Sequence, residues 1–148
     1  MGLLQSMRIS ASSLLAQRLR MDVVANNVAN MNTTRTATGG PYRRQTVAIA
    51  EQGREVVFRD FLRRESGEAG TGGGVQVTAI REDNTPPRRV FDPSHPDADG
   101  DGYVLLPDIN VVTEMTDLLS ARRAYEASVT VLNATKSMAL RALEIGRG

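Results

Sequence analysis

The sequence predicts a mainly α-helical protein with a small β-rich middle, and three observations lead to this fold class. Apolar residues recur with a period of about 3.5 at both ends of the 148-residue chain, as in long packed helices. All six prolines lie between positions 41 and 107, so the middle must differ from the ends. Only 4% of the residues are aromatic and none is Trp, which suits helix–helix packing better than a sandwich core.

Residues 2–31 are predicted to form one amphipathic helix. Its apolar series is interrupted at Arg18, and its expected length of about 45 Å exceeds what a small domain needs to cover a core. The series, spaced alternately by three and four, is Leu4, Met7, Ala11, Leu14, Met21, Ala25 and Val28.

Residues 35–108 are predicted to be a β-rich and loop region. Five glycines within residues 66–74 indicate a flexible loop. Alternating and β-branched segments between turn residues indicate short strands. The expected strands are 47–49, 56–58 and 75–80, with 90–91 and 103–106 as shorter candidates.

Residues 109–146 are predicted to form a second, longer helix, capped by Asp108 or Asn110. Arg122 and Lys136 occupy two interrupted positions in its apolar series. The series is Val111, Met115, Leu118, Tyr125, Val129, Leu132, Ala139 and Leu143.

The two terminal helices indicate an assembling protein. Residues 1–34 and 109–148 together predict one inner coiled-coil domain, but a two-stranded coil covers only a narrow seam. Val112, Leu119 and Val131 would remain exposed outside it. Either many copies pack, termini inward, into a tube or filament, or the chain is a soluble coiled-coil adapter that forms a small closed oligomer. The periodicity alone leaves both hypotheses open.

Four asparagines crowd the end of the first helix: Asn26, Asn27, Asn30 and Asn32. Asn is a poor residue for a helix interior, so the simplest interpretation is a frayed helix end. Their number favours a second interpretation, in which amides buried between helices fix the packing register.

Few residues suit catalysis or metal binding. The chain has no Cys and one His, His95, so thiol chemistry, a catalytic triad and a zinc set are excluded and no enzyme is expected. Four acids fit positions of an EF-hand-like loop, but position 12 is Asp rather than Glu, Pro93 and Pro96 argue against a preceding helix, and Pro107 occupies position 11. A solvated acidic turn is therefore favoured, and we expect no metal and no cofactor. The four acids are Asp97, Asp99, Asp101 and Asp108.

Charge and hydropathy exclude further classes. The formal net charge is +1, which argues against binding of nucleic acid. No apolar run approaches the roughly 20 residues of a membrane span, and no secretory signal peptide is recognisable at the N-terminus. Export would therefore need another route.

Two long motifs resemble the signatures of the bacterial flagellar rod and hook family. Residues 24–34, Val-Ala-Asn-Asn-Val-Ala-Asn-Met-Asn-Thr-Thr, and the turn 39–44, Gly-Gly-Pro-Tyr-Arg-Arg, are similar to the N-terminal signature. Residues 110–127, Asn-Val-Val-Thr-Glu-Met-Thr-Asp-Leu-Leu-Ser-Ala-Arg-Arg-Ala-Tyr-Glu-Ala, are similar to the C-terminal one, although Ser128 stands where Asn is usual. The short chain, the acidic turn at 92–104 and the ending at 131–138 most resemble the proximal-rod members.

This resemblance, which covers residues 3–46 and 75–146, implies a structural subunit of the basal-body proximal rod. Such subunits pass through the flagellar type III export apparatus without a cleaved signal peptide and polymerise in the periplasm into a hollow driveshaft that transmits motor torque. The implied partners are other copies, other proximal and distal rod subunits, and the inner-membrane ring with its rod-junction protein. The residues expected at the assembly interface are Leu14, Met21, Asn26, Asn27, Val28, Asn30, Met115, Leu118, Tyr125, Val129 and Leu132.

Overall fold

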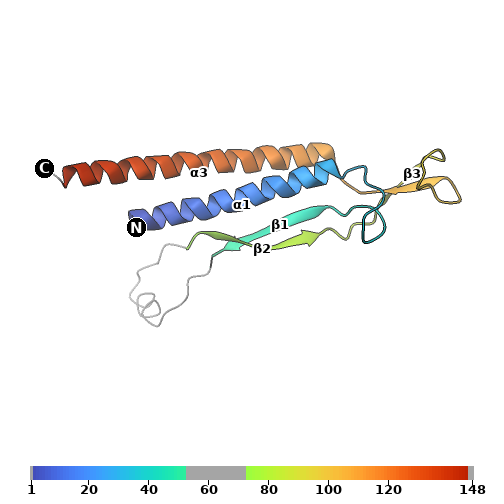
Figure 1. Cartoon of the computed structure of the whole chain (residues 1–148), viewed down its shortest axis with the longest axis horizontal. Helices are drawn as coiled ribbons and strands as arrows, with labels where there is room; N and C mark the ends of the chain where they lie inside the picture. The colour runs from blue at the N-terminus through green and yellow to red at the C-terminus, as the bar shows by residue number, and fades with distance from the viewer. Residues whose placement is uncertain (1, 53–72, 147–148) are drawn as a thin grey trace, which may run out of the picture. The chain divides into compact units, whose positions relative to one another are not determined.

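The computed structural model describes residues 2–52 and 73–146, and it confirms the predicted fold class. In the sequence, a small region of short paired strands lies between two long helices (Figure 1). The predicted strand at 56–58 and most of the glycine loop 66–74 lie outside the described residues. The elements are α1 (Leu3–Ala29), β1 (Gln45–Glu51), β2 (Val75–Glu82), β3 (Arg88–Phe91), β4 (Tyr103–Leu106) and α3 (Val111–Ile145).

Asn side chains bond to the backbone at the end of α1 and at the start of α3, the two helix ends next to the middle region. The Asn30 side chain donates to the Asn26 carbonyl at 3.0 Å, and this carbonyl in the last turn of α1 also accepts from the Asn30 backbone amide at 3.0 Å. At the start of α3, the Asn110 side chain accepts from the amides of Val112 and Thr113 at 3.0 and 3.3 Å. Asn110 is therefore the N-cap, rather than Asp108.

The chain divides into two compact units, which are described separately. Unit 1 consists of Met1–Gln17, Ile49–Thr78 and Arg123–Gly148, and unit 2 of Arg18–Ala48 and Ala79–Arg122.

In unit 2, the last part of α1 lies antiparallel to the first part of α3 (Figure 1). Arg20 contacts Asp117 and Asn27 contacts Glu114, so residue numbers rise along one helix as they fall along the other. The buried apolar residues of this unit include Val23, Val24 and Ala121 on the helices.

Unit 2 also contains the β3–β4 hairpin, whose antiparallel register pairs Val90 with Val104 and Phe91 with Tyr103. Val104 is buried, whereas Phe91 and Tyr103 lie edge to face on the exposed side, with ring centroids 5.3 Å apart. Gly102 has φ +78°, and a Cβ there would lie 3.0 Å from the Phe91 ring. The turn before β4 therefore requires Gly at this position.

In unit 1, α1 contacts both α3 and the start of β2. The Ser13 and Ser128 hydroxyls are 3.0 Å apart, and the Ser12 hydroxyl accepts from the Val75 amide at 3.1 Å. Gly74 has φ +106°, and a Cβ there would lie 2.5 Å from the Ser12 hydroxyl oxygen. Gly74 thus allows the strand backbone to approach the helix closely.

The most buried positions of α3 are one residue away from part of the predicted apolar series. Glu114, Ala121 and Thr135 are buried, whereas Met115, Arg122 and Lys136 beside them are exposed. The helical period of α3 is as predicted. At every second position of its buried face, however, the residue is small or polar rather than large and apolar. In the part of the chain that the structure covers, no helix is both long and apolar enough to cross a membrane.

Candidate functional site

Asn27 is the centre of a buried polar network in unit 2. Its side chain is 1% exposed, and its amide nitrogen donates to the Gln45 carbonyl at 2.8 Å and to Glu114 Oε2 at 3.0 Å. Its amide oxygen accepts from the Gln45 N–H at 2.9 Å and from the Tyr42 hydroxyl at 3.1 Å. The Asn27 amide therefore pairs with both peptide groups of Gln45, as a neighbouring strand would, and fixes the start of β1 against α1.

Glu114 is the second centre of the network. It is fully buried in the first turn of α3, where the helix dipole favours an acidic side chain. Its Oε1 accepts from Arg44 Nε at 2.6 Å, while Oε2 accepts from Asn27. A buried carboxylate is tolerated only with such partners, so Glu114 depends on Arg44 and Asn27.

Asp117 extends the network along α3. It forms ion pairs with Arg20 of α1 at 3.1 Å and with Arg44 at 3.6 Å. Two arginines, Arg20 and Arg44, and two acids, Glu114 and Asp117, therefore connect α1, the segment before β1, and α3. Because the Arg20 and Asp117 side chains are about one-third exposed, solvent screens this outer pair, and removal of one partner should cost less there than at the buried Glu114.

The segment between α1 and β1 positions Tyr42 and Arg44. The Tyr42 amide donates to the Thr33 carbonyl at 3.1 Å, and the Thr36 amide donates to the Gly40 carbonyl at 2.9 Å, so the segment closes into a compact loop. Burial raises the pKa of the Tyr42 phenol, and the nearby carboxylates Glu114 and Glu82 raise that pKa further.

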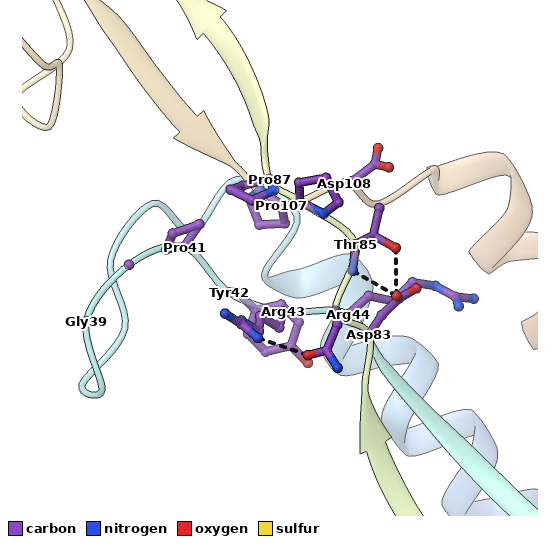
Figure 2. A pocket seen from close by; sticks show the side chains of 13 residues that line it. Gly39, Pro41, Tyr42, Arg43, Arg44, Asp83, Thr85, Pro87, Pro107 and Asp108 are labelled. Atoms are coloured by element: carbon purple, nitrogen blue, oxygen red, sulfur yellow. Dashed lines mark hydrogen bonds between the residues drawn. The ribbon is translucent and has the colours of Figure 1, made fainter.

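A surface pocket adjoins this loop (Figure 2). It is lined by residues 39–44, residues 83–87, Pro107 and Asp108. Arg43 donates to Asn84 at 3.1 Å, and Asp83 accepts from the Thr85 hydroxyl at 2.6 Å. These polar side chains therefore already pair with one another. The Thr85 hydrogen bonds lower the pKa of Asp83.

Two acids of the EF-hand-like segment, Asp97 and Asp99, accept hydrogen bonds from other residues of the chain. Asp97 accepts from the Thr34 hydroxyl at 2.7 Å, and Asp99 accepts from the Tyr103 amide at 2.8 Å and from Arg89 at 3.2 Å. The Tyr103 amide bond is the main cause of a lowered Asp99 pKa. Within residues 2–52 and 73–146, no group of three or more acidic or histidine side chains could hold a metal ion. The structure therefore does not bring the four predicted acids together as a ligand set.

The predicted assembly residues occupy different environments. Asn27 is buried inside the chain, whereas Asn26 and Met115 are exposed. An intersubunit role for these residues stays a prediction, but the structure places the Asn27 amide in contacts within one chain. The half-buried members of the set are Leu14, Met21, Val28, Asn30, Leu118, Tyr125, Val129 and Leu132.

The sequence interpretation missed the partners of Asn27. Tyr42 and Gln45 lie in the segment after α1 and Glu114 lies in α3, so no local spacing connects these partners with Asn27. A usable signal was present, because Glu114 and Asp117 are acids at the positive end of a helix and Arg44 follows the Tyr-Arg turn. Chemically, the network is a set of mutually satisfied charges and amides, which suits fixing a backbone geometry.

Comparison with known proteins connects this architecture to one family. A family model described as "Flagella basal body rod protein" matches residues 7–35. A second, described as "Flagellar basal body rod FlgEFG protein C-terminal", matches residues 101–145. The two matched regions contain most of α1, with its asparagines, and all of α3, and these are the helices that the polar network joins in unit 2.

Relatives named flagellar basal-body rod protein FlgC match over nearly the full length. The Borreliella burgdorferi protein is 45% identical over 152 residues, which cover 100% of each chain. The Bacillus subtilis protein is 46% identical over 96% of this chain and 97% of its own. The Salmonella typhimurium protein is 38% identical over 99% of this chain and 100% of its own. The chain therefore belongs to the FlgC family of flagellar basal-body rod proteins, as a structural subunit of the rod.

Proposed function

We propose that this chain is a subunit of the proximal rod that polymerises, through its terminal helices, into the hollow periplasmic shaft that transmits motor torque. The full-length similarity to proteins named FlgC supports the rod assignment. The small closed adapter has no comparable support.

The observation that carries the polymerisation step is the large apolar surface left exposed on both helices. Large apolar side chains that a helix leaves exposed along its length suit contacts with neighbouring subunits. The exposed members include Leu4 and Leu15 on α1 and Val112, Met115, Leu119, Val131, Met138, Leu140, Leu143 and Ile145 on α3.

The proposed partners follow from this position. They are other copies of the chain, other proximal and distal rod subunits, and the inner-membrane ring with its rod-junction protein. We also propose export through the flagellar type III apparatus without removal of a leader, and a purely structural, non-enzymatic role. The mutually paired groups around Asn27 and Glu114 support that role, because they serve the backbone geometry.

The test is to delete the gene in a flagellated host and restore it as an epitope-tagged full-length chain. We expect the deletion strain to be non-motile, and the tagged chain to restore motility and to copurify with isolated basal bodies. The mass of the recovered chain should show an intact N-terminus, apart from removal of Met1. Normal motility without the gene, or restored motility with no chain in the basal bodies, would reject the proposal.

A further inference from the structure

The turn between β3 and β4 contains both Asp–Gly peptide bonds of the chain, Asp99–Gly100 and Asp101–Gly102. The sequence contains no Asn–Gly bond. An Asp–Gly bond is chemically labile, because a glycine without a Cβ lets its amide nitrogen approach the carboxyl carbon of the preceding aspartate. Both acids are exposed, so water can reach them. Since the two bonds join the same pair of residue types, the fold decides which of them reacts.

The reaction needs a free carboxyl group and a free amide. The glycine nitrogen forms a bond to the aspartate Cγ, and the carboxyl hydroxyl leaves as water together with the amide proton. Water then opens the five-membered succinimide at one of its two carbonyl carbons. Opening at the main-chain carbon leaves the chain running through the side chain, as isoaspartate. The two steps together neither add nor remove atoms, and they need no reagent other than water.

The carboxylate of Asp99 is held away from this reaction. Its Oδ1 accepts from the Asp101 amide at 3.0 Å and from the Tyr103 amide at 2.8 Å. Its Oδ2 accepts from Arg89 at 3.2 Å. The Tyr103 bond is the main cause of the lowered Asp99 pKa, so this carboxylate stays ionised and is a poor electrophile. Three hydrogen bonds must therefore open before the Asp99 Cγ can be attacked.

Asp101 is held less firmly. Within the part of the chain that the structure describes, no residue donates to its carboxylate. The Gly102 amide donates to the Asp99 carbonyl at 2.9 Å, so opening this one bond frees the nucleophile. Gly102 has φ +78°, and a Cβ there would lie 3.0 Å from the Phe91 ring. The turn therefore requires the glycine that makes the Asp101–Gly102 bond labile.

We propose that Asp101 is a site of spontaneous isomerisation to isoaspartate in the folded chain, whereas the hydrogen bonds of Asp99 protect the Asp99–Gly100 bond. The product adds one backbone atom within the turn. The Asp99 amide and the Tyr103 carbonyl, which are 2.8 Å apart, pair across this position, so isomerisation would disturb the start of β4. The proposal is independent of the rod assignment.

The test compares the folded and the unfolded full-length chain. Both are aged at neutral pH and physiological temperature, one in buffer and one in guanidinium chloride. Tryptic peptide 90–122 contains both bonds, and electron-transfer dissociation distinguishes isoaspartate at the two positions. In denaturant we expect similar amounts at 99 and 101. In buffer we expect at least about fivefold more at 101. Equal amounts in buffer would overturn the protection of Asp99, and no isoaspartate at 101 in buffer would overturn the site.

Two variants assign the product and its protection. A Cβ at Gly100 meets nothing within 4 Å, so Gly100→Ala should fold normally. It should remove most isoaspartate at 99 in denaturant and leave position 101 unchanged. Arg89→Gln removes one of the three Asp99 bonds and should raise the product at 99 in buffer by about twofold. The matched control Arg88→Gln, exposed on the opposite face of β3, should not change it. Equal results from the two arginine variants would overturn the role assigned to the Asp99 carboxylate.

Discussion

The two halves of α3 are held in different ways. In unit 2, the side chains of Glu114 and Asp117 reach outside the helix to Arg44, Arg20 and Asn27. In unit 1, several polar side chains of α3 bond back to their own helix, and of these Ser128 also contacts Ser13 of α1. The hydroxyls of Ser128, Thr130, Thr135 and Ser137 each donate to the carbonyl four residues earlier, at 2.8–3.0 Å.

This difference indicates which part of the helix pair the chain specifies by itself. A buried network with all its partners present defines one backbone arrangement and penalises others. A helix half whose hydroxyls bond to its own carbonyls, and whose apolar side chains are largely exposed, gains its order from packing partners. We therefore expect unit 2 to be the stable part of the isolated chain.

The largest expected effect is that of Glu114→Ala. The substitution leaves Arg44 and Asn27 without their buried acceptor, and it should lower the free energy of unfolding by about 3–5 kcal/mol. Urea denaturation of the isolated chain, followed by circular dichroism, measures the change. Glu144→Ala, an exposed acid near the end of α3, is the matched control and should change the same quantity by less than about 0.5 kcal/mol. Equal effects of both variants would show that the two halves of α3 do not differ.

Asn27→Ala should have the next largest effect. It leaves both peptide groups of Gln45 and the Tyr42 hydroxyl without this partner, so the free energy of unfolding should fall by about 2–3 kcal/mol. The neighbouring exposed Asn26→Ala is the control and should change it little. A cost at Asn26 equal to that at Asn27 would mean that the asparagines act through helix propensity rather than through the network.

The positions of the helices and of most strands could be predicted from the sequence. The 3.5-residue period placed both helices to within two residues at each end, because that period extends over many turns. The strand at 103–106 coincides with β4, which lies between a turn glycine and Pro107. It was less predictable which face of α3 is buried. Ranking residues by hydrophobicity selects Met115 over Glu114 for the buried face, whereas Glu114 is the buried residue in the structure.

The network itself was only partly accessible from the sequence. The asparagines suggested an amide that fixes register between helices, and the structure shows a buried amide at Asn27 whose partners lie within one chain. Its partners are the peptide groups of Gln45 and the side chains of Tyr42 and Glu114, which are up to 87 residues away in the chain. Such contacts depend on how β1 lies against the helices, and hydrophobic periodicity carries no information about that placement.

The pH dependence of stability should reveal Tyr42 as part of the network. Its pKa is raised in the folded chain, chiefly by burial, so above pH 10.0 the unfolded phenol ionises first. The stability that Tyr42 contributes is complete below pH 10.0 and is lost as the pH rises through its folded pKa. Tyr42→Phe should remove this part of the alkaline loss and cost about 1 kcal/mol at neutral pH through the missing hydrogen bond to Asn27. Denaturation at several alkaline pH values, with phenolate absorbance, measures both effects. An unchanged alkaline profile in the variant would place the titrating group elsewhere.

The smallest effect on the isolated chain is expected at the far end of α3. Leu143 is 67% exposed, so Leu143→Ser should change the free energy of unfolding by less than about 0.5 kcal/mol. The same substitution should clearly lower incorporation into basal bodies, because there the side chain would be covered by a neighbouring subunit. The half-buried Leu118→Ser is the matched control and should destabilise the isolated chain as well. If Leu143→Ser destabilises the isolated chain as much as Leu118→Ser does, the end of α3 is already packed before assembly. The two halves of the helix would then be equally determined by the chain itself.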